Sequence, residues 1–146
     1  TALLDNDTDW SQKFEGDSHF LCVHWGLLYH LYNWERDLRL ACRFSQMISL
    51  ESEVLDNGDP HAKAERLETG LDQSVNGRAR VPTVQGIERI FKEENMTFQR
   101  FDDPDLNAKM DWGLFKYDWS SFPDHDVSPN NPRFHKRRFW FAYSRN

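Results

Sequence analysis

Residues 18–55 read SHFLCVHWGLLYHLYNWERDLRLACRFSQMISLESEVL, and the spacing of their apolar side chains determines which fold we expect. Apolar side chains recur every three or four residues through most of the stretch, and this spacing is typical of an amphipathic helix. Asp17 and Ser18, just before it, are residue types that cap helices. The sequence therefore predicts a helix from Ser18 to Leu55. Its apolar seam follows Phe20, His24, Leu27, Leu31, Trp34, Leu38, Ala41, Ser45, Ile48, Ser52 and Leu55.

This helix would be long for a chain of 146 residues. At about 1.5 Å per residue it would span roughly 55 Å. A compact domain of this size has a diameter of about 40 Å. Either the helix breaks, with Asn33 the weakest helix former in its first half, or its excess length lies against another chain.

Two further helices are predicted after a clear stop at Asp56-Asn57-Gly58-Asp59-Pro60. The second ends at Asn76-Gly77 and pairs with the first as a helical hairpin. The third is short and begins after the capping residue Thr83. The apolar face of the second consists of Ala64, Leu67, Leu71 and Val75, and that of the third of Val84, Ile87, Ile90 and Phe91.

The apolar period changes from 3.6 to 2 at Met96, which indicates strands. Candidate strands are 96–101, 112–119 and 137–144. We therefore predict an α+β fold: an N-terminal helical hairpin plus a short third helix, packed on a small C-terminal antiparallel sheet of about three strands. Residues 1–16 are expected to form an acidic flexible arm, and residues 17–146 a single α+β domain.

Composition and charge exclude several classes of protein. The net charge of −6 does not favour general binding to nucleic acid or to an anionic membrane. No apolar run reaches about 18 residues, and no signal peptide is recognisable at the start. Cys22 and Cys42 are too few for a disulfide scaffold, and on one helix they would lie about 30 Å apart. We expect reduced thiols in an intracellular protein, cytoplasmic or nuclear, with no membrane partner.

Motifs that define a reaction are missing. The chain has no Gly-rich phosphate loop, no G-x-S-x-G, no H-E-x-x-H and no C-x-x-C. His19, His24 and His30 are spaced by five and six residues, so one helix cannot bring them together on one face. Catalysis is therefore uncertain and not favoured, and we expect no cofactor.

A metal-dependent enzyme is one alternative. Aspartates cluster at residues 102–111, and Asp124-His125-Asp126 follows. Asp103, Asp105, Asp124 and His125 could hold a divalent ion and activate water in a small hydrolase or nuclease. Aspartates are also common turn formers, and this explains the same residues without a metal.

Single-strand nucleic-acid binding is the other alternative. Lys136, Arg137, Arg138 and Trp140 place cations beside an aromatic ring, which suits phosphates and unstacked bases. A strand whose aromatic side chains face its own core explains the same residues, and we favour this interpretation over nucleic-acid binding.

The function that we expect from the sequence is a non-catalytic protein-interaction module, of the adaptor or inhibitor kind. The predicted first helix offers more apolar surface than the rest of the chain can cover, which is typical of an interface. The partner would be another protein, a second copy of the chain, or both. The expected contact residues are Leu27, Leu31, Trp34 and Leu38 on the helix and Trp10 and Phe14 in the acidic arm.

Overall fold

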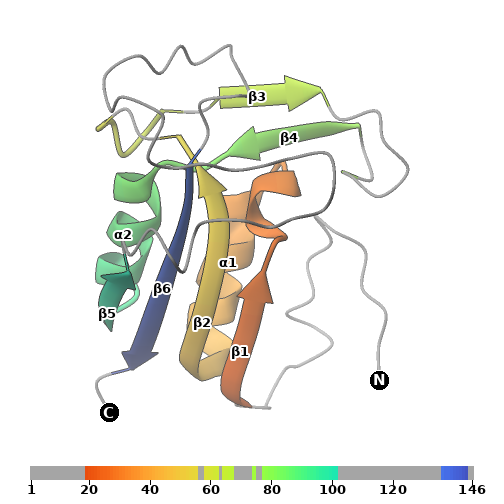
Figure 1. The fold of residues 1–146 in the computed structure, drawn as a ribbon. Coiled ribbons are helices and arrows are strands. Elements are labelled where there is room, and N and C mark those ends of the chain that lie inside the picture. Colours follow the sequence, from red (N-terminus) through yellow and green to blue (C-terminus); the bar gives the residue numbers. More distant parts are fainter. Residues whose placement is uncertain are drawn as a thin grey trace.

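A mixed four-stranded sheet forms the centre of the fold. The computed structural model describes residues 19–55, 58–62, 64–67, 74, 77–101 and 136–144. Within them β1 and β2 are parallel, and β6 runs antiparallel between β2 and β5 (Figure 1). The strands lie in the order β1 (His19–Trp25), β2 (Ser45–Val54), β6 (Lys136–Ser144) and β5 (Met96–Phe101).

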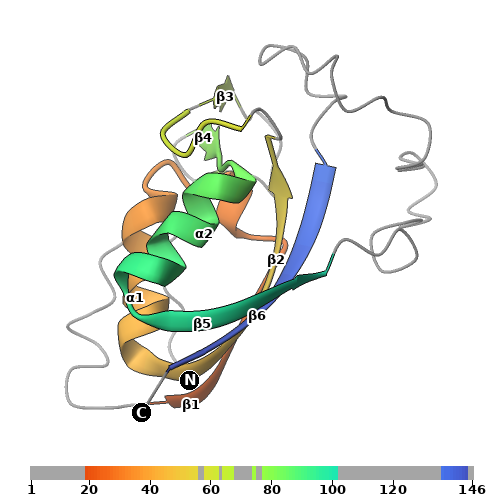
Figure 2. The same cartoon turned by 90° about the vertical axis from the view of Figure 1, so that its left-hand side faces the viewer.

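Two helices cover one face of this sheet, as Figure 2 shows. α1 (Trp34–Phe44) connects β1 to β2 after the 3₁₀ turn η2 (Leu28–His30), and α2 (Val84–Glu93) precedes β5. Their apolar sides and the adjoining side chains of β2, β5 and β6 form the core, whose largest members are fully buried. These are Trp140, Phe91, Leu28, Leu31, Leu38, Ile48, Leu50, Ile87, Ile90 and Val54.

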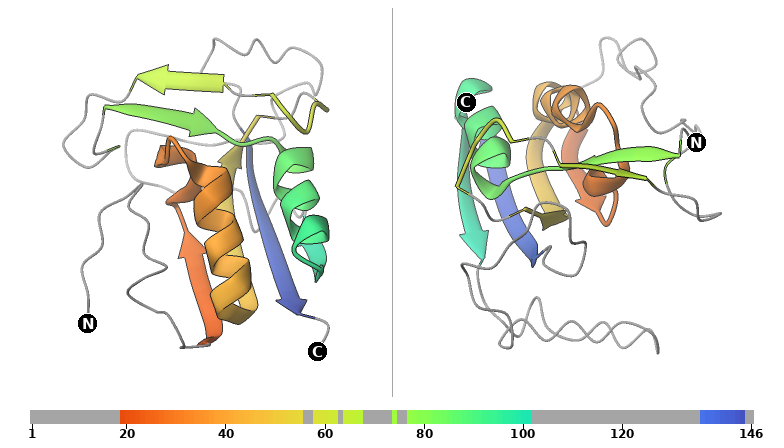
Figure 3. Two further views of the ribbon diagram at one scale, coloured as in Figure 1. Left: turned by 180° about the vertical axis from the view of Figure 1, so that it is seen from behind. Right: turned by 90° about the horizontal axis from the view of Figure 1, so that it is seen from above.

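A β-hairpin lies across the end of the sheet at which β1 and β2 terminate (Figures 1 and 3). It consists of β3 (Ala64–Leu67) and β4 (Arg78–Val81), which pair antiparallel. The backbone joins it to the rest of the fold: Leu55 N–H donates to the Pro82 carbonyl at 2.8 Å, and Arg80 N–H donates to the Leu31 carbonyl at 3.2 Å. The hairpin is therefore fixed above the carboxyl ends of both parallel strands.

The prediction of one helix from Ser18 to Leu55 is wrong, and with it the α+β fold built on an N-terminal helical hairpin. Residues 19–25 and 45–54 are the parallel strands β1 and β2, and only residues 34–44 between them form an α-helix. The buried positions of β2 alternate, with Ile48, Leu50 and Val54 inside. β1, with the sequence HFLCVHW, is apolar on both faces and lacks a clear period of two, so that a three-four spacing can be drawn through it.

Other elements were predicted with mixed success. The second helix is wrong, because residues 64–67 form β3. The third helix is confirmed, with Thr83 Oγ1 accepting a 2.9 Å hydrogen bond from Gly86 N–H. The strands expected at 96–101 and 137–144 are confirmed as β5 and β6. Residues 1–16 and the strand expected at 112–119 lie outside the described residues.

Two expectations about the chain as a whole can be compared with the fold. In the part of the chain that the structure describes, no helix is long and apolar enough to cross a membrane. Cys22 on β1 and Cys42 on α1 are both free thiols. The separation of about 30 Å that one continuous helix would impose does not apply, since the two residues lie on different elements.

Candidate functional site

The carboxyl ends of β1 and β2 lie side by side beneath the hairpin. In open α/β sheets, ligands bind outside the carboxyl ends of the parallel strands. The chain leaves β1 through a turn at Gly26 and leaves β2 at Leu55. This end of the sheet is therefore where we look for a site.

Three polar groups converge where β1 ends. Gly26 has a φ of +66°, a conformation that costs little energy only for glycine, and its N–H donates to Glu51 Oε2 at 2.9 Å. A Cβ on Gly26 would lie 3.9 Å from both the Tyr29 hydroxyl and Glu51 Oε2. A peptide group, a carboxylate and a phenol thus meet at one point, and a larger residue at 26 would fill the space between them.

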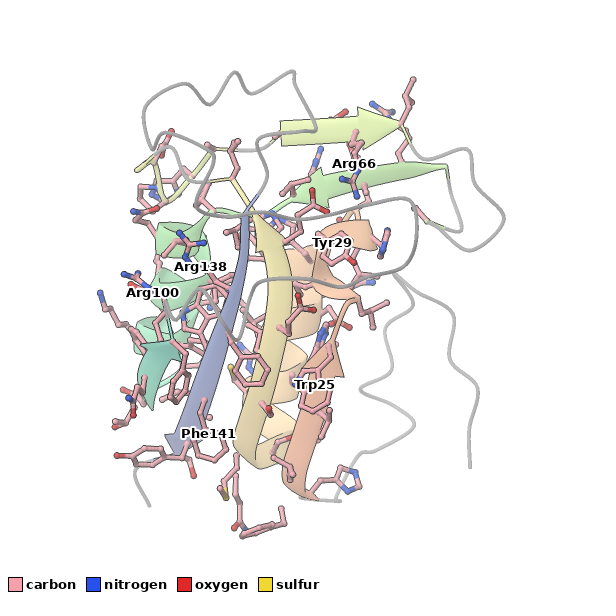
Figure 4. The ribbon with its side chains drawn as sticks, in the orientation of Figure 1. Trp25, Tyr29, Arg66, Arg100, Arg138 and Phe141 are labelled. Carbon is pink, nitrogen blue, oxygen red and sulfur yellow. The ribbon has the colours of Figure 1, made fainter. Side chains whose placement is uncertain are left out.

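A second group of charges lies between the end of β2 and the hairpin. Glu53 is only 4% exposed, and its Oε1 lies 3.2 Å from Arg66 Nη1 on β3. The Arg66 guanidinium also lies over the Tyr29 ring, with Cζ 5.7 Å from the ring centroid. Figure 4 shows Tyr29 and Arg66 together at this end of the molecule. Arg66 thus places a positive charge beside a buried carboxylate and connects the hairpin to β2 and to η2.

The face of the sheet opposite the helices carries three rows of side chains in register. Trp25, Glu51, Phe139 and Phe101 form the row nearest to the carboxyl end of β1. Trp25 and Phe139 have ring centroids 5.8 Å apart, and Trp25 Nε1 donates to Ser49 Oγ at 3.0 Å. We call this the open face, since α1 and α2 lie on the other side. Its two further rows are Val23, Ser49, Phe141 and Gln99, and Leu21, Met47, Tyr143 and Thr97.

Tyr32 and the outer side of the hairpin form another polar cluster. The Arg80 guanidinium lies over the Tyr32 ring, 3.7 Å from its centroid, and Glu65 accepts hydrogen bonds from Arg80 and Arg78. The bonds from Arg80, and then those from Arg78, hold the pKa of Glu65 below its ordinary value. A shallow cavity of about 220 Å³ adjoins the cluster, lined by Tyr32, Asn33, Trp34, Glu35, Arg36 and Arg80. Arg78 and Arg80 in this cluster are paired with Glu65, so we regard the cluster as structural.

A buried polar pair lies on the helix side of β1. His24 is 6% exposed, and its Nε2 lies 2.6 Å from Asp37 Oδ2 on α1. Burial and the nearby Asp37 raise the pKa of the Cys22 thiol. Among the described residues no three His, Cys, Asp or Glu side chains are arranged to hold a metal ion. The His24–Asp37 pair connects β1 to α1.

The expected interface residues occupy other places. Leu31, Trp34 and Leu38 are at most 2% exposed and belong to the core, and Leu27 packs against that core. They are not available to a partner in this fold, because the sheet and α2 cover the face that was expected to be exposed. Trp10 and Phe14 lie outside the described residues.

The residues of the two alternatives are only partly described. Trp140 is fully buried, and its Nε1 donates to Glu88 Oε1 at 3.4 Å, so its ring is not free to stack on a base. Arg138 lies two positions before Trp140 on β6 and is half-buried. Figure 4 labels it together with Arg100. Lys136 and Arg137 belong to β6, and nothing is described of their side chains. Asp103, Asp105, Asp124 and His125 lie outside the described residues.

Comparison with known proteins gives a likeness in fold. No protein family model matches the chain, and no curated protein is similar in sequence. A solved structure of the N-terminal domain of EvdMO1 in the presence of SAH and D-fucose is similar, with 11% identity and a TM-score of 0.60 over 95% of this chain. A second structure of that domain, with SAH bound, gives 11% and 0.57 over 98%. The chain spans about half the length of these matched chains, 52% in each case.

Sequence reasoning missed the residues that meet at the carboxyl ends of the parallel strands. The missed residues are Gly26, Tyr29, Glu51, Glu53 and Arg66. One signal was present: an uncharged run from Phe20 to Trp25 followed directly by glycine reads as a buried strand and a turn. The partnership of Glu53 with Arg66 has no local signal, because it depends on where the hairpin lies.

Proposed function

We propose that the protein binds SAH, S-adenosylhomocysteine, or its methylated precursor S-adenosylmethionine, and that it serves methyl transfer. The observation that carries the proposal is the likeness in fold over 95% of this chain to a domain solved with SAH. S-Adenosylmethionine becomes S-adenosylhomocysteine when it gives up its methyl group, so a site that fits one largely fits the other.

The carboxyl ends of β1 and β2 support this proposal. The turn at Gly26 exposes backbone without a side chain, and this permits close approach of a ligand. The Glu51 carboxylate beside it is an acceptor of the kind that binds a ribose hydroxyl or the amino group of the ligand.

We expect the described residues to supply only part of the site. The chain covers 52% of the matched chain. The acceptor substrate and the activity of the whole protein therefore depend on residues outside this part of the site as well. In this proposal Gly26, Tyr29 and Glu51 form one wall, and Arg66 and Glu53 keep the hairpin in place above it. The acceptor of the methyl group is left open.

Titration calorimetry with SAH on the protein purified from its natural source tests the proposal. We expect measurable heat and a raised melting temperature, because a ligand that binds only the folded state stabilises it. ATP at the same concentration controls for general affinity for adenine nucleotides. Neither heat nor a shift in melting temperature with SAH would remove the proposal.

Two matched variants assign the binding site. Glu51→Gln keeps the shape of the side chain and removes its charge, so we expect SAH affinity to fall about tenfold, as for the loss of one charge-assisted hydrogen bond. Glu65→Gln makes the same change on the hairpin, away from Gly26, and should change affinity less than twofold. Equal effects of the two variants would place the ligand elsewhere.

Protein interaction without catalysis is a second candidate. The observation in its favour is the exposure of apolar side chains on β1, with Val23 at 56% and Trp25 at 57%. In this case a foreign protein would cover β1, and SAH would have no effect on the heat of mixing or on the melting temperature. The SAH titration therefore separates the two candidates.

A further inference from the structure

β1 lies at an edge of the sheet but has the sequence of an inner strand. Its residues, HFLCVHW, include no Lys, Arg, Asp or Glu. At the opposite edge, β5 reads MTFQRF and exposes Gln99 and Arg100. Edge strands of soluble proteins carry charges or other features that prevent further pairing. β5 has such a charge, whereas the seven residues of β1 include none.

Among the described residues, β1 lacks cover along the open face and, at Phe20 near its start, on the helix side as well, although α1 covers Cys22 and His24. Leu21, Val23 and Trp25 lie on the open face and are 45%, 56% and 57% exposed. Side chains alternate along a strand, so Phe20 points to the helix side, where it is 68% exposed. A single extended peptide would cover the edge but not these side chains. A strand with a packed layer on each face would cover all of them.

The direction of β1 leads to the same conclusion. β1 and β2 are parallel and joined through α1. Parallel strands occur mostly within sheets that are covered on both faces, and their sequences are nearly continuous apolar runs. Among the described elements no strand pairs with the other side of β1. In addition, about half of each matched chain has no counterpart in these 146 residues.

We propose that the free edge of β1 is an inner seam of a larger α/β sheet. A further strand of the same polypeptide, beyond the 146 residues, pairs with β1 in parallel, and the helices that flank this strand cover Phe20 on one face and Leu21, Val23 and Trp25 on the other. The seam is inferred from β1 itself and does not depend on which ligand the protein binds.

A second copy of the chain fits this edge less well. A symmetric pair of edge strands would run antiparallel about an axis normal to the sheet. Such an axis leaves both open faces on the same side of the joined sheet. Leu21, Val23 and Trp25 would then stay exposed in both copies, whereas the strand with flanking helices covers them.

Amide hydrogen exchange on two samples tests the seam. One sample is the protein from its natural source, purified with an antibody raised against the sequences of β6 and α2. The intact mass of this protein is measured. The other is the recombinant chain of 146 residues. We expect the natural protein to exceed 17.4 kDa. We also expect its β1 amides to exchange as slowly as those of β2, and at least tenfold more slowly than β1 amides in the recombinant chain.

Two lysine variants of the recombinant chain complete the test. The unpaired edge should make the recombinant chain associate as its concentration rises, as sedimentation velocity will show. Val23→Lys should reduce this association at least tenfold, and Gln99→Lys on β5 should leave it unchanged. Circular dichroism checks that both variants are folded. Equal effects of the two substitutions would overturn the assignment of β1 as the open edge.

Each remaining outcome supports the seam or overturns it. A natural protein of 17.4 kDa overturns it at any rate of β1 exchange, and if that protein is a dimer with slow β1 exchange, the edge belongs to a second copy. A longer natural protein with fast β1 exchange also overturns it. A longer natural protein with slow β1 exchange supports the seam whether or not SAH binds. Failure of the proposed function and failure of the seam are therefore distinguishable.

Discussion

Glu53 and Arg66 form an ion pair at the place where β2 ends beneath the hairpin, with Oε1 and Nη1 3.2 Å apart. Glu53 comes from β2 and Arg66 from β3, so the pair connects the sheet to the hairpin. The carboxylate is almost fully buried, and Arg66 is 21% exposed. Because little water reaches Glu53, its attraction to Arg66 is poorly screened.

Removal of Arg66 should therefore destabilise the protein more than removal of both partners. We expect Arg66→Met to lower the free energy of unfolding by about 3 kcal/mol, since it removes a counter-charge from a buried carboxylate. The double variant Glu53→Gln with Arg66→Met should recover part of that loss. Urea unfolding followed by circular dichroism measures both. A double variant less stable than Arg66→Met alone would contradict this account.

Gly86 is a helix residue that cannot become alanine without cost. A Cβ there would lie 2.9 Å from Thr83 Oγ1 and 3.1 Å from the Pro60 carbonyl oxygen. In a helix, alanine is more stable than glycine by about 1 kcal/mol, but crowding in a packed site costs about 1–3 kcal/mol. We expect Gly86→Ala to lower the melting temperature and weaken the Thr83 cap.

The control for Gly86 is Lys92→Ala on the same helix. Lys92 is exposed, and its ammonium lies 5.9 Å from the Phe98 ring centroid, a weak contact. We expect the unfolding free energy to change by about 0.5 kcal/mol or less. If Gly86→Ala raised the melting temperature, helix propensity would outweigh the contacts with Thr83 and Pro60.

The sequence predicts local features of this fold better than its arrangement. Thr83 is recognisable as a cap because its hydroxyl acts within one turn of α2, and β5 and β6 are recognisable by their alternation. Asn33 was the expected weak point of the first helix, and α1 does begin directly after it. These features depend on neighbours in the chain.

The features that failed depend on distant contacts. The sequence predicts a helix at β1 because HFLCVHW is apolar on both faces, which hides the period of two. Leu31 and Leu38 were expected at an interface because the elements that bury them come later in the chain. The group around Gly26 was missed because Glu51 reaches it only through the pairing of β1 with β2.

Acid should reduce stability through Glu94. Hydrogen bonds from Arg43, with further help from Arg39, hold the pKa of Glu94 below its ordinary value of 4.5, although burial acts in the opposite direction. The folded protein thus favours the ionised carboxylate more than the unfolded chain does. This contribution is fully present above about pH 4.5 and is lost as the pH falls through the lower, folded-state pKa.

Urea unfolding between pH 6 and pH 3 measures this loss. We expect Glu94→Gln to have a flatter dependence of unfolding free energy on pH than the natural sequence, because the amide does not titrate. Arg43→Gln should flatten it in part, since Arg39 still bonds Glu94. The same slope in all three proteins would exclude Glu94 as a source of the acid sensitivity.

The two thiols should be inert in the folded protein and should make it less stable in alkali. Burial, followed by the nearby Glu94, raises the pKa of Cys42 from 9.0 to about 12. Burial also raises the pKa of Cys22. The thiolate is the reactive form, and at pH 8 very little of it is present on Cys42. A raised pKa contributes stability that is fully present below about pH 9 and is lost as the pH rises toward 12.

Reaction with a chromogenic disulfide reagent at pH 8 measures these reactivities. We expect Cys42 to react about 1,000-fold more slowly in the folded protein than in guanidinium, from the difference in thiolate fraction alone. Cys22→Ser and Cys42→Ser assign each rate to one thiol, and Cys22 should be the faster because it is only half-buried. A Cys42 that reacts equally fast in both solvents would mean that the contact between α1 and the sheet opens readily, which its packing in the core does not predict.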